Sequence, residues 1–299
     1  MFQLKDVSRK QAVLSHIGIS LIIFLIVLYF IVFHWYPQPF FSTDGGWQGV
    51  QLLAAVDIVL GPLLTLIIFK PGKKGLKTDV ITIATIQFLA LFSGLYVIHN
   101  ERPVAKIFQD GNFYIVTGYD MTKRNISLKD LERYRVDNAI TIYLDLPDEH
   151  KAFEDLLYSS RKKKELLYLN TSLYKKIDAE KIKKMRRFSI DIERYIKEKY
   201  GKEKLSILTS LLKKHNAKVD DFLYLGLHSR YKHAITVLDP ETLKFIDVVP
   251  TIYKPEIDEL SKYIDFDIYR IESYKKQLLE ESKKKNQQKI NHKKALFLN

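Results

Sequence analysis

Three apolar stretches in the first hundred residues constrain the fold of this chain more than any other feature. They cover residues 14–33, 50–69 and 80–98. Each is close to the roughly 20 apolar residues that a helix needs to cross a bilayer. The sequence therefore predicts a transmembrane domain of three α-helices over residues 1–103.

A cleaved signal peptide is the competing interpretation of the first stretch. Its apolar segment would be shorter than residues 14–33, and a cleavage site of small residues would follow it. An aromatic segment that begins at His34 follows instead, and its Trp35 and Tyr36 suit the interface between membrane and water. We therefore expect the first helix to be retained, with Trp35 and Tyr36 as interface aromatics.

Basic residues in the short loops predict the orientation of the three helices. The N-terminal tail holds three basic residues and loop 70–79 holds four, whereas loop 34–49 holds none. Because basic loops stay in the cytoplasm, the N-terminus and loop 70–79 are expected inside, and residues 100–299 outside the cytoplasm. The residues expected to anchor the cytoplasmic loop are Lys70, Lys73, Lys74 and Lys77.

The second apolar stretch is unusual because it contains an acid, Asp57, and a Gly61-Pro62 break one turn later. An ionisable group in a membrane needs a partner, and proline frees backbone groups. Small and polar residues on one face also allow a second helix to approach closely and to form hydrogen bonds. The predicted intramembrane partner-binding face comprises Ala54, Asp57, Gly61, Pro62, Thr65, Gln87, Ala90, Ser93 and Gly94.

Three interpretations of Asp57 remain open at this stage. Its carboxyl group is hydrogen-bonded within its own bundle, or it belongs to a docking face for another transmembrane helix. A proton or solute pathway is the third interpretation, but three helices with one acid are few for a transporter and no inverted repeat is visible.

The remainder of the chain has the pattern of an α+β domain with antiparallel strands over residues 104–272. Alternating apolar runs flank Asp110-Gly111, a strong hairpin signal, and a further strand is expected at 139–144. Alternation in the strand at 222–228 predicts one buried leucine face. The helices are expected at 148–169, 172–188, 190–200 and 202–215, followed by strands at 222–228, 234–238 and 243–249.

The last segment, residues 273–299, carries eight lysines against two glutamates and is expected to be an exposed helical or disordered tail. The formal net charge of +13 invites a nucleic-acid interpretation. Most of the lysines, however, alternate with glutamates at helical spacing, as on a solvated face. We therefore expect no nucleic-acid partner; anionic membrane lipid or an acidic protein is the expected counterpart.

Neither catalysis nor a cofactor is indicated. The chain has no cysteine, which excludes thiol chemistry, disulfides and Cys-ligated metals. It has no glycine-rich phosphate loop and none of the common hydrolase or metalloprotease motifs. His228 and His233 flank a turn, but no third metal ligand is evident. The sequence therefore predicts a protein that is not an enzyme, with no metal or cofactor.

Several membrane-proximal segments, in the same order, resemble the type IV pilin accessory proteins of the TfpX/TfpZ kind. The segments that carry the resemblance are Trp35–Phe40, Asp57–Lys74, Gln87–Tyr96 and Arg102–Val104. The resemblance is close over residues 30–110. It implies a multi-pass protein of the bacterial inner membrane, with a cytoplasmic N-terminus and a periplasmic C-terminal domain.

The function that the resemblance implies is assistance or modulation of type IV pilus assembly. The implied partners are the cognate major pilin and other inner-membrane pilus-assembly proteins. The transmembrane bundle would receive the pilin helix and the periplasmic domain would touch the pilin head. The alternative is a membrane-anchored periplasmic sensor or binding module without a pilin partner. Such a sensor would need a separate signalling protein, because the expected cytoplasmic segments are too short for an output domain.

Overall fold

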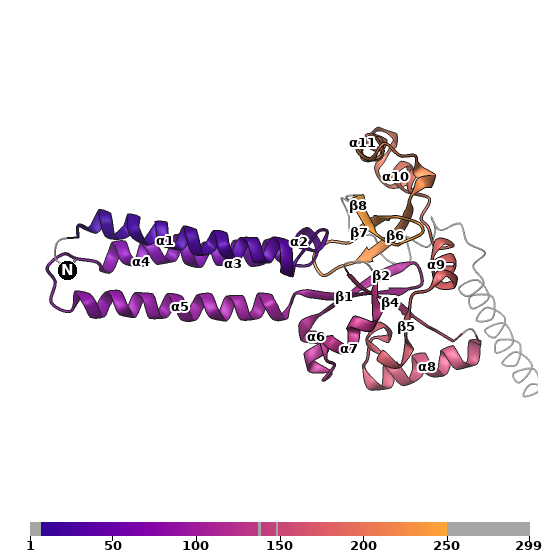
Figure 1. Ribbon diagram of the computed structural model, residues 1–299, viewed down its shortest axis with the longest axis horizontal. Helices are drawn as coiled ribbons and strands as arrows, with labels where there is room; N and C mark the ends of the chain where they lie inside the picture. The colour runs from indigo at the N-terminus through magenta and orange to yellow at the C-terminus, as the bar shows by residue number, and fades with distance from the viewer. Residues whose placement is uncertain (1–6, 137–138, 148, 250–299) are drawn as a thin grey trace, which may run out of the picture.

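A computed structural model describes residues 7–136, 139–147 and 149–249 of the 299 residues. The predicted basic tail, residues 273–299, and the last part of the predicted 104–272 domain lie outside these described residues. The two parts that are described, a helical rod and a sheet-containing domain, follow one another along the chain (Figure 1).

Three long helical segments lie side by side and form the rod (Figure 1). Each is long and apolar enough to cross a membrane: Arg9–Trp35, Gly46–Ile68 and Leu76–Asn100. This confirms the three predicted membrane helices, so the chain is a membrane protein. The elements are α1 (Arg9–Phe30), η2 (Ile31–Trp35), α2 (Phe40–Thr43), α3 (Gly46–Ala54), η3 (Ala55–Leu60), α4 (Gly61–Ile68) and α5 (Leu76–Asn100).

The middle span is continuous but contains a π-helical segment, η3, at Asp57. The Gly61 N–H bonds to the carbonyl of Val56, five residues earlier. Pro62 has no N–H to donate to the carbonyl of Ile58, and its ring crowds that turn. Insertion of an extra residue into the turn relieves the conflict, and such π-bulges often occur at functional sites.

The middle span is also the centre of the bundle. Both α1 and α5 pack against it, and they make little contact with each other. At the end near the sheet, a small core closes all three spans. Its buried members are Ile31, Tyr36, Val50, Leu53 and Ile98.

The second part of the chain is built on one mixed sheet in the order β3-β4-β1-β2-β6-β7-β8, with β5 also paired to β4. The α+β class is confirmed, but the expected antiparallel arrangement needs a correction, since β1–β4 and β2–β6 are parallel pairs. Long connections containing helices return the chain in the same direction, which a tight hairpin cannot do. The strands are β1 (Pro103–Gln109), β2 (Asn112–Thr117), β3 (Arg135–Val136), β4 (Ala139–Leu144), β5 (Tyr174–Lys176), β6 (Leu223–His228), β7 (Ala234–Leu238) and β8 (Phe245–Val249).

Helices cover both faces of the sheet. The longer ones are α6 (Gly118–Lys123), α7 (Leu128–Leu131), α8 (His150–Lys163), α9 (Ala179–Arg186), α10 (Ile192–Tyr200) and α11 (Leu205–His215). Short 3₁₀ turns connect them: η4 (Glu132–Tyr134), η5 (Leu167–Leu169), η6 (Thr171–Leu173), η7 (Lys202–Lys204) and η8 (Val219–Asp221).

Burial on the two faces explains the pattern of the central strand β6. Leu225 packs with Met185 of α9 on one face. On the other face Tyr224 packs with Ile196 of α10. The predicted leucine face is therefore buried, and the opposite face is buried as well, because a central strand here carries helices on both sides.

The expected helix over 172–188 is wrong in its first half. Residues Tyr174–Lys176 form β5, which pairs with β4 through Tyr174 and Leu144. The helix α9 begins only after Asp178, whose carboxylate accepts the Lys181 N–H at 2.9 Å as an N-cap. A basic local sequence favours a helix, but pairing with the exposed edge of β4 determines the structure of this segment.

Candidate functional site

The predicted partner-binding face does not form one continuous surface. Two of its small residues serve packing within the bundle. A Cβ at Gly61 would lie 1.7 Å from Nε2 of Gln87, and a Cβ at Gly94 would lie 3.3 Å from Cδ2 of Leu53. A larger residue at position 61 would therefore force the Gln87 side chain to move from its place over the middle span.

The other members of that face are distributed around the bundle. Pro62 is buried and Ala54 is half-buried in the middle span, whereas Ala90 and Ser93 are exposed on α5. Only Asp57, Thr65 and Gln87 of the predicted face line a common cavity.

His16 of α1 joins these three polar residues, and sequence reasoning missed it. Its Nδ1 lies 2.6 Å from Oγ1 of Thr65, which in turn donates to the Gly61 carbonyl at 3.2 Å. His16 also interacts with Gln87. The available signal was a histidine inside the first apolar stretch, because an ionisable residue in a membrane helix is by default a candidate functional residue.

Asp57 faces the same cavity without a hydrogen-bonding partner. Its side chain is only 5% exposed. Within the described part of the chain no residue donates a hydrogen bond to its carboxyl group, and the nearby charge that acts on it is His16. The interpretation in which Asp57 is hydrogen-bonded inside its own bundle therefore gains no support from the described residues.

The cavity has a volume of about 570 Å³ and follows the groove between α1 and α5. Residues of α1, among them Ala12, His16 and Ile19, form one wall. Ala84 and Phe88 of α5 stand on the other wall. The middle span provides the floor with Asp57 and Thr65. We call this feature the α1–α5 groove.

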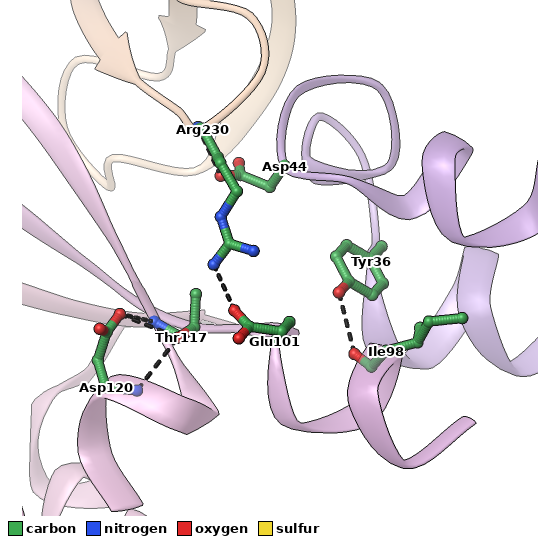
Figure 2. Close-up of polar contacts among 7 residues, drawn as sticks. All are labelled: Tyr36, Asp44, Ile98, Glu101, Thr117, Asp120 and Arg230. Carbon is green, nitrogen blue, oxygen red and sulfur yellow. Dashed lines mark hydrogen bonds and ion pairs between the residues drawn. The ribbon is translucent and has the colours of Figure 1, made fainter. Parts of the chain in front are cut away.

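A second polar cluster joins the bundle to the sheet domain, and Figure 2 shows its main contacts. The loop after the first span bends back, and the Tyr36 hydroxyl donates to the carbonyl of Ile98 at 2.9 Å. The turn between β6 and β7 meets the same loop. The Tyr231 and Lys232 N–H groups both donate to the Thr43 carbonyl, at 3.0 and 3.2 Å.

Arg230 is the residue of this turn that contacts two segments of the bundle. Its backbone N–H donates to Asp44 Oδ1 at 3.2 Å, and its guanidinium pairs with Glu101 just after α5. Burial raises the pKa of Asp44, although hydrogen bonds from Arg230 and Thr43 favour its charged form. The turn therefore ties the loop after the first span to the end of the third span.

The start of α6 is a third point of attachment. Thr117 and Asp120 form a reciprocal capping box at its N-terminus (Figure 2). The Gly118 N–H donates to the Arg102 carbonyl at 3.0 Å. A Cβ at Gly118 would lie 2.9 Å from the Asn100 carbonyl, so the helix end and the sheet domain are in direct backbone contact there.

The remaining predicted residues lie at the two ends of the bundle. Tyr36 is buried in the junction, and the Trp35 ring packs edge-on against His99 with centroids 5.1 Å apart. At the far end, the predicted anchor lysines Lys70, Lys73, Lys74 and Lys77 are exposed, and Lys73 pairs with Asp79 at 2.6 Å.

The described residues contain no group of three or more metal-ligating side chains. His228 and His233 lie together, with ring centroids 3.9 Å apart, and His233 Nδ1 accepts the Ser229 N–H at 3.2 Å. The pair therefore flanks the β6–β7 turn that meets the bundle.

About a third of this chain is similar in sequence to proteins from Dichelobacter nodosus. The chain is 33% identical over 109 residues to the fimbrial assembly protein of serogroups C1 and C2, which covers 36% of this chain and 82% of that protein. It is also 33% identical over 109 residues to the fimbrial assembly protein of serogroup E1, covering 42% of that protein. The serogroup I protein is 35% identical over 97 residues, covering 37% of its length.

The fold and the site define a membrane protein in which a bundle of three helices is joined to an α+β domain. The chain covers less than half of the serogroup E1 and I relatives, but most of the C1/C2 relative. On that match, the chain belongs to the family of fimbrial assembly proteins. No protein-family model matches it, and no solved structure matches it.

Proposed function

We propose that this protein is an inner-membrane accessory protein of type IV pilus assembly, of the TfpX/TfpZ kind. The observation that carries the proposal is its relationship to proteins named for fimbrial assembly. Three membrane-spanning helices agree with a role beside the membrane-embedded stage of pilus assembly. The proposed role is one of binding and positioning and involves no catalysis.

The partner in this proposal is the cognate major pilin. The bundle binds the membrane helix of the pilin, and the α+β domain contacts its head outside the membrane. The junction at Arg230 supports such a double contact, because it attaches the two parts at several points and limits their relative rotation. A pilin held at both ends would be presented in one orientation.

The proposed topology follows from the basic loops. The exposed lysines of loop 70–79 face the cytoplasm, and the sheet domain that begins near residue 104 faces the periplasm. Accessibility labelling of single cysteines tests the topology cleanly, because the chain has no cysteine of its own. A cysteine at Lys74 should react only after the inner membrane is permeabilised. A cysteine at Tyr158 should react while the inner membrane is still intact.

Photocrosslinking in living cells tests the function. A photoreactive residue replaces Ala84 in the α1–α5 groove or the exposed Tyr231 beside β7, and captured proteins are identified by mass spectrometry. Ile86, exposed on α5 but absent from the groove lining, provides the matched control. Capture of the major pilin at Ala84 and Tyr231, and not at Ile86, is the expected result. Capture of a different membrane protein without pilin would favour a sensor or binding module.

A further inference from the structure

The shape of the α1–α5 groove is that of a bundle with one side missing. Its lining extends from Ala12 to Ile23 on α1 and from Val80 to Leu91 on α5. At 1.5 Å per residue both walls are about 16 Å long, or three helical turns. Because α1 and α5 pack on the middle span but hardly on each other, a fourth helix placed between them would complete a four-helix bundle.

The walls of the groove are suited to such a helix. Ile19 is 60% exposed and Phe88 is 65% exposed, and both line the groove. Apolar side chains flank small ones, Ala12 and Ala84, which let a neighbouring helix approach closely.

The floor of the groove specifies the chemistry of the occupant. The side chains of His16 and Thr65 are hydrogen-bonded to each other, and Gln87 interacts with His16. Asp57, nineteen-twentieths buried, has no hydrogen-bond donor among the described residues. A carboxyl group at membrane depth without a donor is costly, so a ligand that supplies one gains affinity.

The depth of Asp57 decides between a lipid and a protein helix as the donor. Asp57 lies eleven residues from each end of its span, Gly46–Ile68, which is about 16 Å from either end. Aminolipid head groups lie at the membrane surface, and the hydrocarbon core is about 30 Å thick, so their amines are too far away. A side chain in the middle of a membrane-spanning helix lies at the correct depth.

We propose that the α1–α5 groove binds one transmembrane helix of a partner protein and that Asp57 pairs with a basic side chain near the middle of that helix. This inference concerns the same groove that the proposed function assigns to the pilin helix, and it adds the chemistry of the partner helix without depending on the identity of the partner. The charge is complementary: an amino or guanidinium group donates hydrogen bonds and neutralises the carboxylate in a medium where an unpaired charge is unstable.

Binding of designed peptides to the full-length protein in lipid nanodiscs tests the inference. One peptide is a Leu/Ala transmembrane helix with a single central lysine, and its matched control has norleucine at that position. Binding is measured by energy transfer from a dye on the peptide to a dye on the protein. The lysine peptide should bind about 3- to 20-fold more tightly, the range that interhelical hydrogen bonds give in membranes.

Two pairs of variants distinguish the contribution of the carboxyl group to peptide binding from the contribution of the shape of the groove. Asp57→Leu should abolish the preference for lysine, and Asp57→Glu should retain it. Ala84→Phe should fill the groove and weaken both peptides, whereas Ala90→Phe, at an exposed position on α5 outside the groove lining, should weaken neither.

Equal binding of the lysine and norleucine peptides to the wild-type protein would overturn the inference. The same holds if Ala90→Phe blocks binding and Ala84→Phe does not. Because the peptides are synthetic, such a failure leaves pilin capture unaffected. Conversely, a lysine preference without pilin capture in cells would support this groove and contradict the proposed function.

Discussion

Tyr36→Phe isolates one hydrogen bond that closes the junction between the bundle and the sheet domain. The hydroxyl donates to the Ile98 carbonyl at 2.9 Å, and the Tyr36 side chain is 2% exposed. This carbonyl is in the last turn of α5. The N–H of Arg102, four residues later, donates to the carbonyl of His99 and not to that of Ile98. The phenylalanine variant therefore leaves a buried acceptor without its partner, which costs about 1–3 kcal/mol of unfolding free energy.

Tyr96→Phe is the matched control. Tyr96 is on the same helix, is 64% exposed, and forms no hydrogen bond from its hydroxyl within the described residues. Loss of its hydroxyl should change the unfolding free energy by less than about 0.5 kcal/mol. Each variant loses one tyrosine hydroxyl group. The difference between their unfolding free energies therefore reports the hydrogen bond from Tyr36 to Ile98.

Equilibrium unfolding in mixed micelles, with increasing sodium dodecyl sulfate, measures both variants. Fluorescence of the two tryptophans, Trp35 and Trp47, follows the transition, and Trp35 packs on His99 beside the junction. Tyr36→Phe should shift the unfolding constant by at least about fivefold relative to the wild type, and by more than Tyr96→Phe does. Equal midpoints and slopes for the two variants would refute the argument that Tyr36 caps α5.

Two further predictions concern backbone strain and pH. Gly45→Ala should destabilise the junction by more than Gly72→Ala in the same assay: both glycines have positive φ, but only at Gly45 does the new Cβ meet a neighbour, the Tyr231 ring, at 2.8 Å. Burial raises the pKa of Asp247, but hydrogen bonds from His215 and a lysine bring it below its usual value. Its stabilising contribution is therefore present at neutral pH and lost as pH falls below about 4. Acid should lower the protection of the β8 amides against hydrogen exchange, measured relative to intrinsic exchange at the same pH, less in Asp247→Asn than in the wild type; an equal loss of protection in both would contradict the assignment.

Local features of the sequence predicted much of the fold. The apolar length of each of the three spans is sufficient to recognise a membrane helix, because the bilayer sets that length. The Asp110-Gly111 hairpin also appears as expected, with positive φ at both residues. The strand Ala139–Leu144 has the predicted boundaries.

Features that depend on distant segments were not predictable in this way. The segment Tyr174–Lys176 has a helix-like basic composition and becomes a strand because β4 presents an edge to it. The parallel pairing of β2 with β6 depends on how the intervening helices return the chain. The contact of Arg230 with Asp44 joins residues 186 positions apart, and no local pattern indicates it.

The residues of the candidate site were likewise predictable from the sequence only in part. Sequence alone identified Asp57, Thr65 and Gln87 as polar residues in apolar helices, since the cost of burying them in hydrocarbon marks them wherever they lie. Only the tertiary structure decided that they meet His16, that Gly61 and Gly94 are used for internal packing, and that Asp57 faces a groove between two helices that hardly touch. The physical reason is that composition and spacing determine which residues a membrane helix can carry and on which face, whereas helix packing determines which faces meet.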